Sequence, residues 1–101
     1  MALIHHLHVV RHALPLPGYL LLLDFEDREL RVADLSPWIE RGGAFAPLMD
    51  ADYFEQVRID EEAGTVVWPN GLDLDPDVLY SQSRPIRPGK LREWLAHAAQ
   101  D

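Results

Sequence analysis

GTVVWPNGLDLDPDVLY, residues 64–80, places a short strand, a tight turn and the start of a helix in direct succession. Two valines precede Trp68, and β-branched and aromatic residues of this kind favour a strand. Asn70 and Gly71 follow, and both residue types tolerate the positive φ of a turn. We therefore interpret the stretch as a structural block in which a strand turns and runs into a helix.

The aspartates of this block alternate, as they do at the start of a calcium-binding loop. The rest of such a loop is missing, because Val78 stands where a glycine is needed and Arg84 where a bidentate glutamate belongs. Asp75 followed by Pro76 instead predicts a helix N-cap and the first helical residue. We therefore expect a capped helix and no calcium site.

Packing of the block follows from its apolar residues. We expect Trp68 to be buried against the helix that Asp75 caps, Leu72 and Leu74 to enter the core, and Tyr80 to close the far end of that helix. A second interpretation stays open, because Trp and Tyr are enriched in binding hot spots. The candidates for such contacts are Trp38, Trp68, Asn70 and Tyr80.

The N-terminal half predicts three strands. Residues 7–14 form the first, which we expect the following prolines to end. Residues 19–25 and 29–35 form a hairpin, and the first arm belongs in the middle of a sheet because it is apolar on both faces. In the second arm Val32 and Arg31 face opposite sides, which is typical of a half-buried strand.

Three further segments complete the core of the domain. Ser36 and Pro37 predict an N-cap and a first helical residue, and the glycines at 42–43 predict the end of that helix. Residues 46–57 have the apolar spacing of a helical or turn-rich segment. Residues 57–68 predict a second hairpin.

The C-terminus predicts a basic amphipathic helix over about residues 88–99. Its apolar stripe has the spacing i, i+3, i+4, i+7 and consists of Leu91, Trp94, Leu95 and Ala98. The fold class that follows is α+β, a single domain over residues 1–101. We expect a curved, meandering antiparallel sheet of about five strands with short helices.

Composition restricts the classes of function. The chain has 101 residues, a formal charge of −8 and no cysteine, which excludes disulfides and cysteine-based zinc sites. The N-terminus has no signal-peptide pattern, and the apolar run at 19–23 is far too short to span a bilayer. We expect a soluble cytoplasmic protein that does not interact with membranes.

Charge is distributed unevenly. Residues 50–77 hold nine acidic residues against the single cation Arg58. The negative surface disfavours direct binding of nucleic acid. A solvated acidic face explains the pattern, and a surface for a basic protein partner stays open. Four of the nine cations follow in the C-terminal segment: Arg84, Arg87, Lys90 and Arg92.

Histidines at positions 5, 6, 8 and 12 are the only cluster with metal-ligating character. On a regular strand His6, His8 and His12 share one face, but no acidic residue precedes Asp24 to support them. We predict no resident metal and no cofactor.

The chain has few side chains that could act as nucleophiles: Ser36, Thr65, Ser81 and Ser83. No glycine elbow or phosphate loop surrounds these residues, so we predict no catalytic residues and no enzyme activity.

The motifs at 16–19, 34–37 and 57–80 resemble those of a small bacterial family, domain of unknown function 2442. That family combines "LPxY", a strand ending in "DLSP", and "VxxDxxxGTIxWPNGxDLDPDxLY", and the resemblance covers about residues 10–80. Gly18 and Arg28 depart from it, because the family often has an acid and a glycine at these turns. The resemblance implies a compact α+β domain without established catalytic residues. Some relatives carry a helix-turn-helix, and others lie in toxin–antitoxin-like gene neighbourhoods.

These observations lead to one functional hypothesis and one alternative. We expect a non-enzymatic module that binds another protein, as the acidic, antitoxin-like member of a pair, and a homodimer stays open. The alternative is a regulatory domain that binds a small molecule or a metal through the histidine cluster, or a minor hydrolase.

Overall fold

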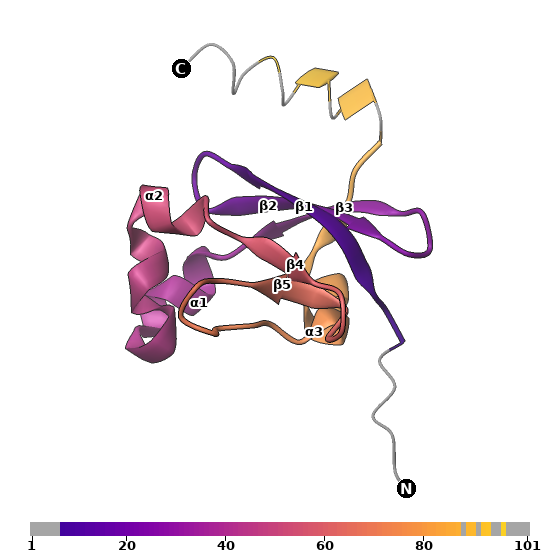
Figure 1. Ribbon diagram of the computed structural model, residues 1–101. Helices are drawn as coiled ribbons and strands as arrows, with labels where there is room; N and C mark the ends of the chain where they lie inside the picture. Colours follow the sequence, from indigo (N-terminus) through magenta and orange to yellow (C-terminus); the bar gives the residue numbers. More distant parts are fainter. Residues whose placement is uncertain (1–6, 88, 91, 94–95, 97–101) are drawn as a thin grey trace, which may run out of the picture.

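The computed structural model describes residues 7–87, 89–90, 92–93 and 96. In this part of the chain a four-stranded antiparallel sheet is covered on one face by a two-stranded hairpin and short helices (Figure 1). The predicted α+β class is confirmed, although the strands belong to two sheets. The elements are β1 Val10–Leu16, β2 Leu20–Phe25, β3 Leu30–Asp34, α1 Ser36–Arg41, the 3-10 helix η1 Gly43–Met49, α2 Ala51–Phe54, β4 Arg58–Asp60, β5 Thr65–Val67, α3 Pro76–Gln82 and β6 Arg84–Pro85.

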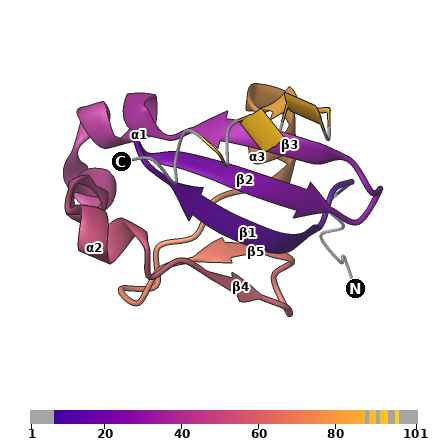
Figure 2. The ribbon, with the colours of Figure 1, turned by 90° about the horizontal axis from the view of Figure 1, so that it is seen from above.

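The larger sheet has the strand order β1-β2-β3-β6. β2 lies in its interior, as its apolar character on both faces predicted. Leu21, Leu23 and Phe25 of β2 are fully buried on the face toward the helices, which we call the inner face. Side chains alternate along a strand, so Leu20 and Leu22 lie on the opposite, outer face. Figure 2 views the sheet from the outer side.

β3 alternates as predicted, but its polar side is not in solvent. Arg31 pairs with Leu23 and therefore lies on the inner face, where its side chain is only 11% exposed. Val32 lies on the outer face and is nevertheless 9% exposed. α3 packs against the inner side of the strand, and on the outer side Val32 lines a groove together with Ile86 and Lys90.

β1 differs from the prediction for residues 7–14 in both its bounds. It begins at Val10 and continues through Pro15 to Leu16, where it still pairs with β2. The prediction that the prolines end the strand was wrong, because β1 is an edge of this sheet and an edge strand tolerates a missing N–H. Gly18 and Tyr19, both with positive φ, then make the turn into β2.

α1 begins one residue earlier than predicted. Ser36 is its first residue and not its N-cap, and the N-cap Leu35 offers no side-chain bond. Asp34 supplies the local bond in its place, since its Oδ1 accepts the Ser36 N–H at 2.9 Å. Pro37 stands in the first turn, and the helix ends before Gly42 as predicted. Residues 46–57 are helical and turn-rich, as η1 and α2.

The predicted second hairpin is confirmed as β4 and β5. Its turn packs beside β1, where the N–H of Val10 donates to the Gly64 carbonyl at 2.9 Å. A side chain at position 64 would lie 3.2 Å from a methyl of Val9, and the φ of +69° also favours glycine. The hairpin therefore closes the open edge of the larger sheet at a point of close backbone approach.

The 64–80 block folds largely as predicted. Asp75 accepts the N–H groups of Asp77 and Val78, and α3 begins at Pro76. Gly71 has a φ of +86° and donates to the Trp68 carbonyl at 2.9 Å in the predicted turn. Trp68 is 1% exposed, and its ring centroid lies 6.0 Å from that of Phe54 in α2. Its indole N–H donates to the Phe54 carbonyl at 3.0 Å.

The core lies between the inner face, the β4–β5 hairpin and the helices. Leu74 is buried in it and Leu72 packs against it, as predicted. The helix predicted over residues 88–99 falls largely outside the described residues, as do Leu91, Trp94, Leu95 and Ala98. The core consists of Val10, Leu21, Leu23, Phe25, Ala33, Leu35, Ile39, Leu48, Phe54, Val66, Trp68, Leu74 and Leu79.

Candidate functional site

A network of polar and aromatic contacts surrounds Tyr80, near the end of α3. His8 stacks on the Tyr80 ring with the ring centroids 3.6 Å apart. The guanidinium carbon of Arg31 lies 4.2 Å from the centroid of the same ring. The Tyr80 hydroxyl donates to Asp27 at 2.9 Å and to Glu29 at 3.0 Å. We call these five residues the Tyr80 cluster.

Hydrogen bonding sets the ionisation of the Tyr80 cluster. The carboxylate of Asp27, followed by that of Glu29, raises the pKa of Tyr80 to about 12. A backbone hydrogen bond from Glu29 lowers the pKa of Asp27, and the Tyr80 hydroxyl adds to that lowering. The phenol therefore stays protonated at neutral pH and acts as a donor. It is unsuited to serve as a base or a nucleophile.

Arg31 connects the Tyr80 cluster to the end of α3. Its Nε donates to the Ser83 hydroxyl at 2.7 Å and its Nη2 to the Ser83 carbonyl at 2.8 Å. Its Nη1 pairs with Glu29 at 2.8 Å. A guanidinium group that is largely buried requires hydrogen-bond acceptors and an opposite charge of this kind. One feature of the sequence indicated this role, since Arg31 is the single cation of β3 and is flanked by Leu30 and Val32.

His8 also forms a pair with Asp77. Its backbone N–H donates to Asp77 Oδ1 at 2.9 Å, and its Nδ1 lies 3.1 Å from the same oxygen. Such a pair can orient a general base when a nucleophile lies beside it. The candidate hydroxyls are used elsewhere: Ser81 donates to the Val78 carbonyl, Ser83 to the Tyr80 carbonyl and Thr65 to the Leu74 carbonyl. The pair holds His8 against α3, and these three hydroxyls donate to backbone carbonyls.

His8 and His12, the two candidate metal ligands that the structure describes, are not brought together. His8 lies on Tyr80 and Asp77, whereas His12 pairs with Asp24 at 2.9 Å on the outer side of β1 and β2. Within the described residues no group of three His, Cys, Asp or Glu could hold a metal ion. His5 and His6 lie outside the described residues.

The predicted binding residues have different surroundings. Trp68 is buried, and Trp38 is half-buried against the core. Tyr80 is half-buried within its cluster. Asn70 is exposed, but its Oδ1 accepts the N–H of Leu72 and so supports the turn. Of the four side chains, Asn70 is the one classed as exposed.

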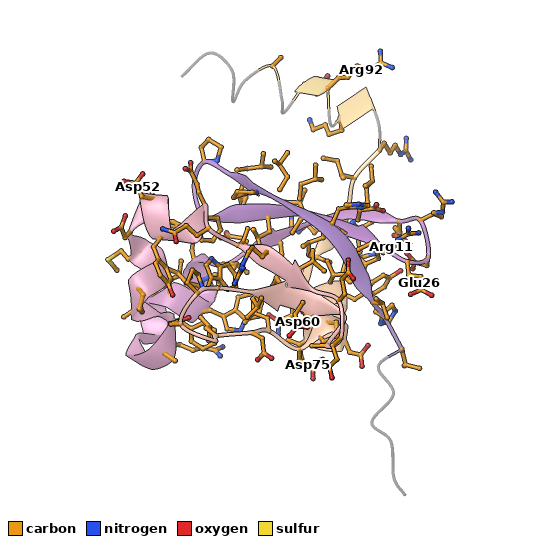
Figure 3. All side chains as sticks on the ribbon, viewed as in Figure 1. Arg11, Glu26, Asp52, Asp60, Asp75 and Arg92 are labelled. Carbon is orange, nitrogen blue, oxygen red and sulfur yellow. The ribbon has the colours of Figure 1, made fainter. Side chains whose placement is uncertain are left out.

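Two surfaces on opposite sides of the molecule are candidates for contacts. The first lies where the β4–β5 turn and the loop before α3 meet, because Thr65 pairs with Asp60 and its hydroxyl donates to the Leu74 carbonyl. Figure 3 shows Asp60 and Asp75 on this side, opposite Arg92. We call its exposed members the acidic face: Glu61, Glu62, Asp73 and Asp75.

The second surface is a groove of about 510 Å³ on the outer side of the sheet, where β3 and β6 meet. Arg84 and Lys90 line it together with the polar residues Asp34 and Gln82. We call it the outer groove, and its apolar walls are Leu20, Val32, Pro37, Pro85 and Ile86.

The sequence of the chain matches a known protein family. A model of the family described as Protein of unknown function (DUF2442) matches residues 10–85 of the 101. The chain belongs to this family. The match contains both hairpins, the 64–80 block and β6, and so confirms the resemblance seen in the motifs. No curated protein and no solved structure matches the chain. Among the described residues, no helix has the length and apolar character needed to cross a membrane.

Proposed function

We propose that this member of the DUF2442 family is a protein-binding module that recognises a basic partner through its acidic face. The observation that supports the proposal most is the separation of charge. Acidic side chains gather where the β4–β5 turn meets the loop before α3, whereas Arg84 and Lys90 line the outer groove. Figure 3 shows Arg92 on the side opposite Asp60 and Asp75. Such a dipolar arrangement steers and orients a partner of opposite charge.

Rigid backbone supports the acidic face. Asp60 Oδ1 accepts the N–H groups of Glu62 and Ala63 and so fixes the β4–β5 turn. Val67 forms a bridge with Asp73, which holds the next loop against the hairpin. A surface with fixed loops loses little conformational entropy when a partner binds. Charge and rigidity together suit recognition of another protein.

In the cell, we place the protein in the cytoplasm as the acidic, antitoxin-like member of a pair, with the basic member as its partner. The family resemblance motivates this choice, since some relatives lie in toxin–antitoxin-like gene neighbourhoods. A metal-binding regulatory role has less support, because His8 and His12 each pair with a different carboxylate at separate places.

Co-expression tests whether a partner exists. The full chain would be produced with the protein encoded beside it, and the mixture separated by size exclusion at low and at physiological salt. We expect co-elution that weakens as salt rises, because screening acts on exposed charges. Separate elution at both salt concentrations would contradict the proposed pairing.

A further inference from the structure

The β4–β5 hairpin carries a groove on the side that points away from the core. Val66 and Trp68 are buried in the core, so Val67 between them faces the other way and is half-buried. β4 lies at the outer edge of the molecule in Figure 2. The groove has a volume of about 520 Å³, within the range of about 300–1,000 Å³ that is typical of binding clefts. We call it the hairpin groove, and its lining includes Arg58, Asp60, Glu61, Val67 and Pro69.

Charged side chains flank the apolar floor of the hairpin groove. Val67 pairs with Arg58 on one side and bridges to Asp73 on the other, so the three side chains form a row across one face. Asp60 follows Arg58 by two positions in β4 and therefore lies on the same face. Glu61 comes next and is exposed at the turn. Since Glu61 and Asp73 also belong to the acidic face, the hairpin groove is continuous with that face.

We propose that the hairpin groove binds an extended segment of the basic partner, with one apolar side chain over Val67 and Pro69 and a lysine or arginine on each side of it. This inference rests on the proposed function, because it states which part of a basic partner is bound. Asp60 is a diagonal neighbour of Val67, at about 7–8 Å, and Asp73 is its direct neighbour, at about 4.5–5.5 Å. Alternate side chains of an extended segment lie about 6–7 Å apart. The pattern basic–x–apolar–x–basic therefore brings one cation near each carboxylate.

A basic segment fits the hairpin groove better than a second copy of the chain or a nucleic acid does. The chain has a net charge of −8, and a second copy would bring its own acidic face against these carboxylates. Phosphate groups are repelled in the same way. Arg58 disfavours a positive side chain directly over itself, which restricts the register in which the segment binds. An apolar centre with a polar rim is also the usual composition of a binding surface.

Peptide binding tests the inference on the full chain. The probe is a dye-labelled peptide of serines with two lysines four positions apart and a leucine midway between them. The control peptide has serine in place of the leucine and keeps both charges. We expect fluorescence anisotropy to show several-fold tighter binding of the leucine peptide, because its side chain leaves water over Val67 and Pro69.

Two results of the peptide experiment would overturn the inference. Equal binding of the two peptides would remove the apolar anchor and leave recognition of a basic partner intact. Binding of neither peptide would exclude the hairpin groove as the site, whereas the proposed function is decided separately by co-elution with the neighbouring protein.

Pro69→Asp and Asn70→Asp separate burial from charge. Both substitutions add one negative charge to the same exposed turn, but Pro69 lines the hairpin groove and Asn70 lies outside its lining. Aspartate at position 70 still offers an acceptor to the Leu72 N–H. We expect Pro69→Asp to weaken binding of the leucine peptide several-fold despite the added attraction, because the apolar side chain would have to desolvate a carboxylate. Asn70→Asp should leave binding unchanged or slightly tighter. Equal strengthening by both substitutions would show attraction by charge alone and contradict the inference.

Discussion

In the turn between β2 and β3, Arg28 holds a φ of 72°, a conformation that L-residues with side chains rarely adopt. The family often has glycine here. The left-handed conformation costs a side-chain-bearing residue about 1–2 kcal/mol, and the greater freedom of glycine in the unfolded chain offsets about 0.4–1 kcal/mol. We expect Arg28→Gly to raise the free energy of unfolding by about 0.5 kcal/mol in urea titrations. Arg28→Ala should give no such gain, and an equal gain would show that the charge matters and not the backbone.

Tyr80 makes the free energy of unfolding depend on pH in the alkaline range. Its pKa is raised to about 12 in the folded protein by Asp27 and Glu29, and lies near 10 when the chain unfolds. Between these values the unfolded state loses the proton first, so the contribution is present below pH 10 and lost as pH rises toward 12. Tyr80→Phe should therefore flatten the fall in stability over this range. Denaturation at several pH values measures the slope, and an unchanged slope would refute the assignment.

Within the 64–80 block, Trp68 is the side chain that we expect to contribute most to stability. Trp68→Ala should lower the free energy of unfolding by roughly 3–5 kcal/mol, because it removes a fully buried ring and its bond to Phe54. Trp68→Phe retains most of the packing and should cost less, so it keeps the test readable if the alanine variant unfolds. Trp38→Ala is the control, since that ring is only half-buried. Equal losses for Trp38 and Trp68, measured by denaturant titration, would contradict this assignment.

The cap of α3 gives a second test of the same block. Asp75→Ala removes the acceptor for two backbone N–H groups and should cost about 1 kcal/mol. Asp73→Asn should change stability by less than about 0.5 kcal/mol, because the exposed side chain lies outside the helix start. Thermal unfolding of both variants provides the comparison. A larger loss for Asp73→Asn than for Asp75→Ala would contradict the assignment of Asp75 as the N-cap of α3.

Over the whole molecule, the sequence predicted the structural features that are set by residues close together along the chain. The two hairpins, the Asn70–Gly71 turn and the Asp75 cap each depend on residues a few positions apart, and all were found. The packing of the β4–β5 hairpin beside β1 was not predicted, because it depends on a bond between the distant residues Val10 and Gly64. Strand pairing between distant segments leaves no periodic signal in a single sequence.

The candidate sites show the same limit. His8 and Asp77 are 69 positions apart, and Arg31 and Ser83 are 52 apart. His8 and Tyr80 were candidates for separate sites, but nothing in the sequence placed them beside each other or beside Arg31, so the Tyr80 cluster was not predicted. The acidic face was indicated by composition, but only the meeting of the β4–β5 turn with the loop before α3 shows which acids lie together.

Titration calorimetry with the purified partner tests most directly whether the acidic face is the binding surface. Glu61→Lys with Glu62→Lys reverses two charges on that face, whereas Glu40→Lys with Glu55→Lys makes the same change in net charge on α1 and beside α2. We expect the first pair to weaken binding by about tenfold or more, equivalent to about 1.4 kcal/mol, and the control pair to weaken it far less. Equal affinities of the two double variants would contradict recognition through the acidic face.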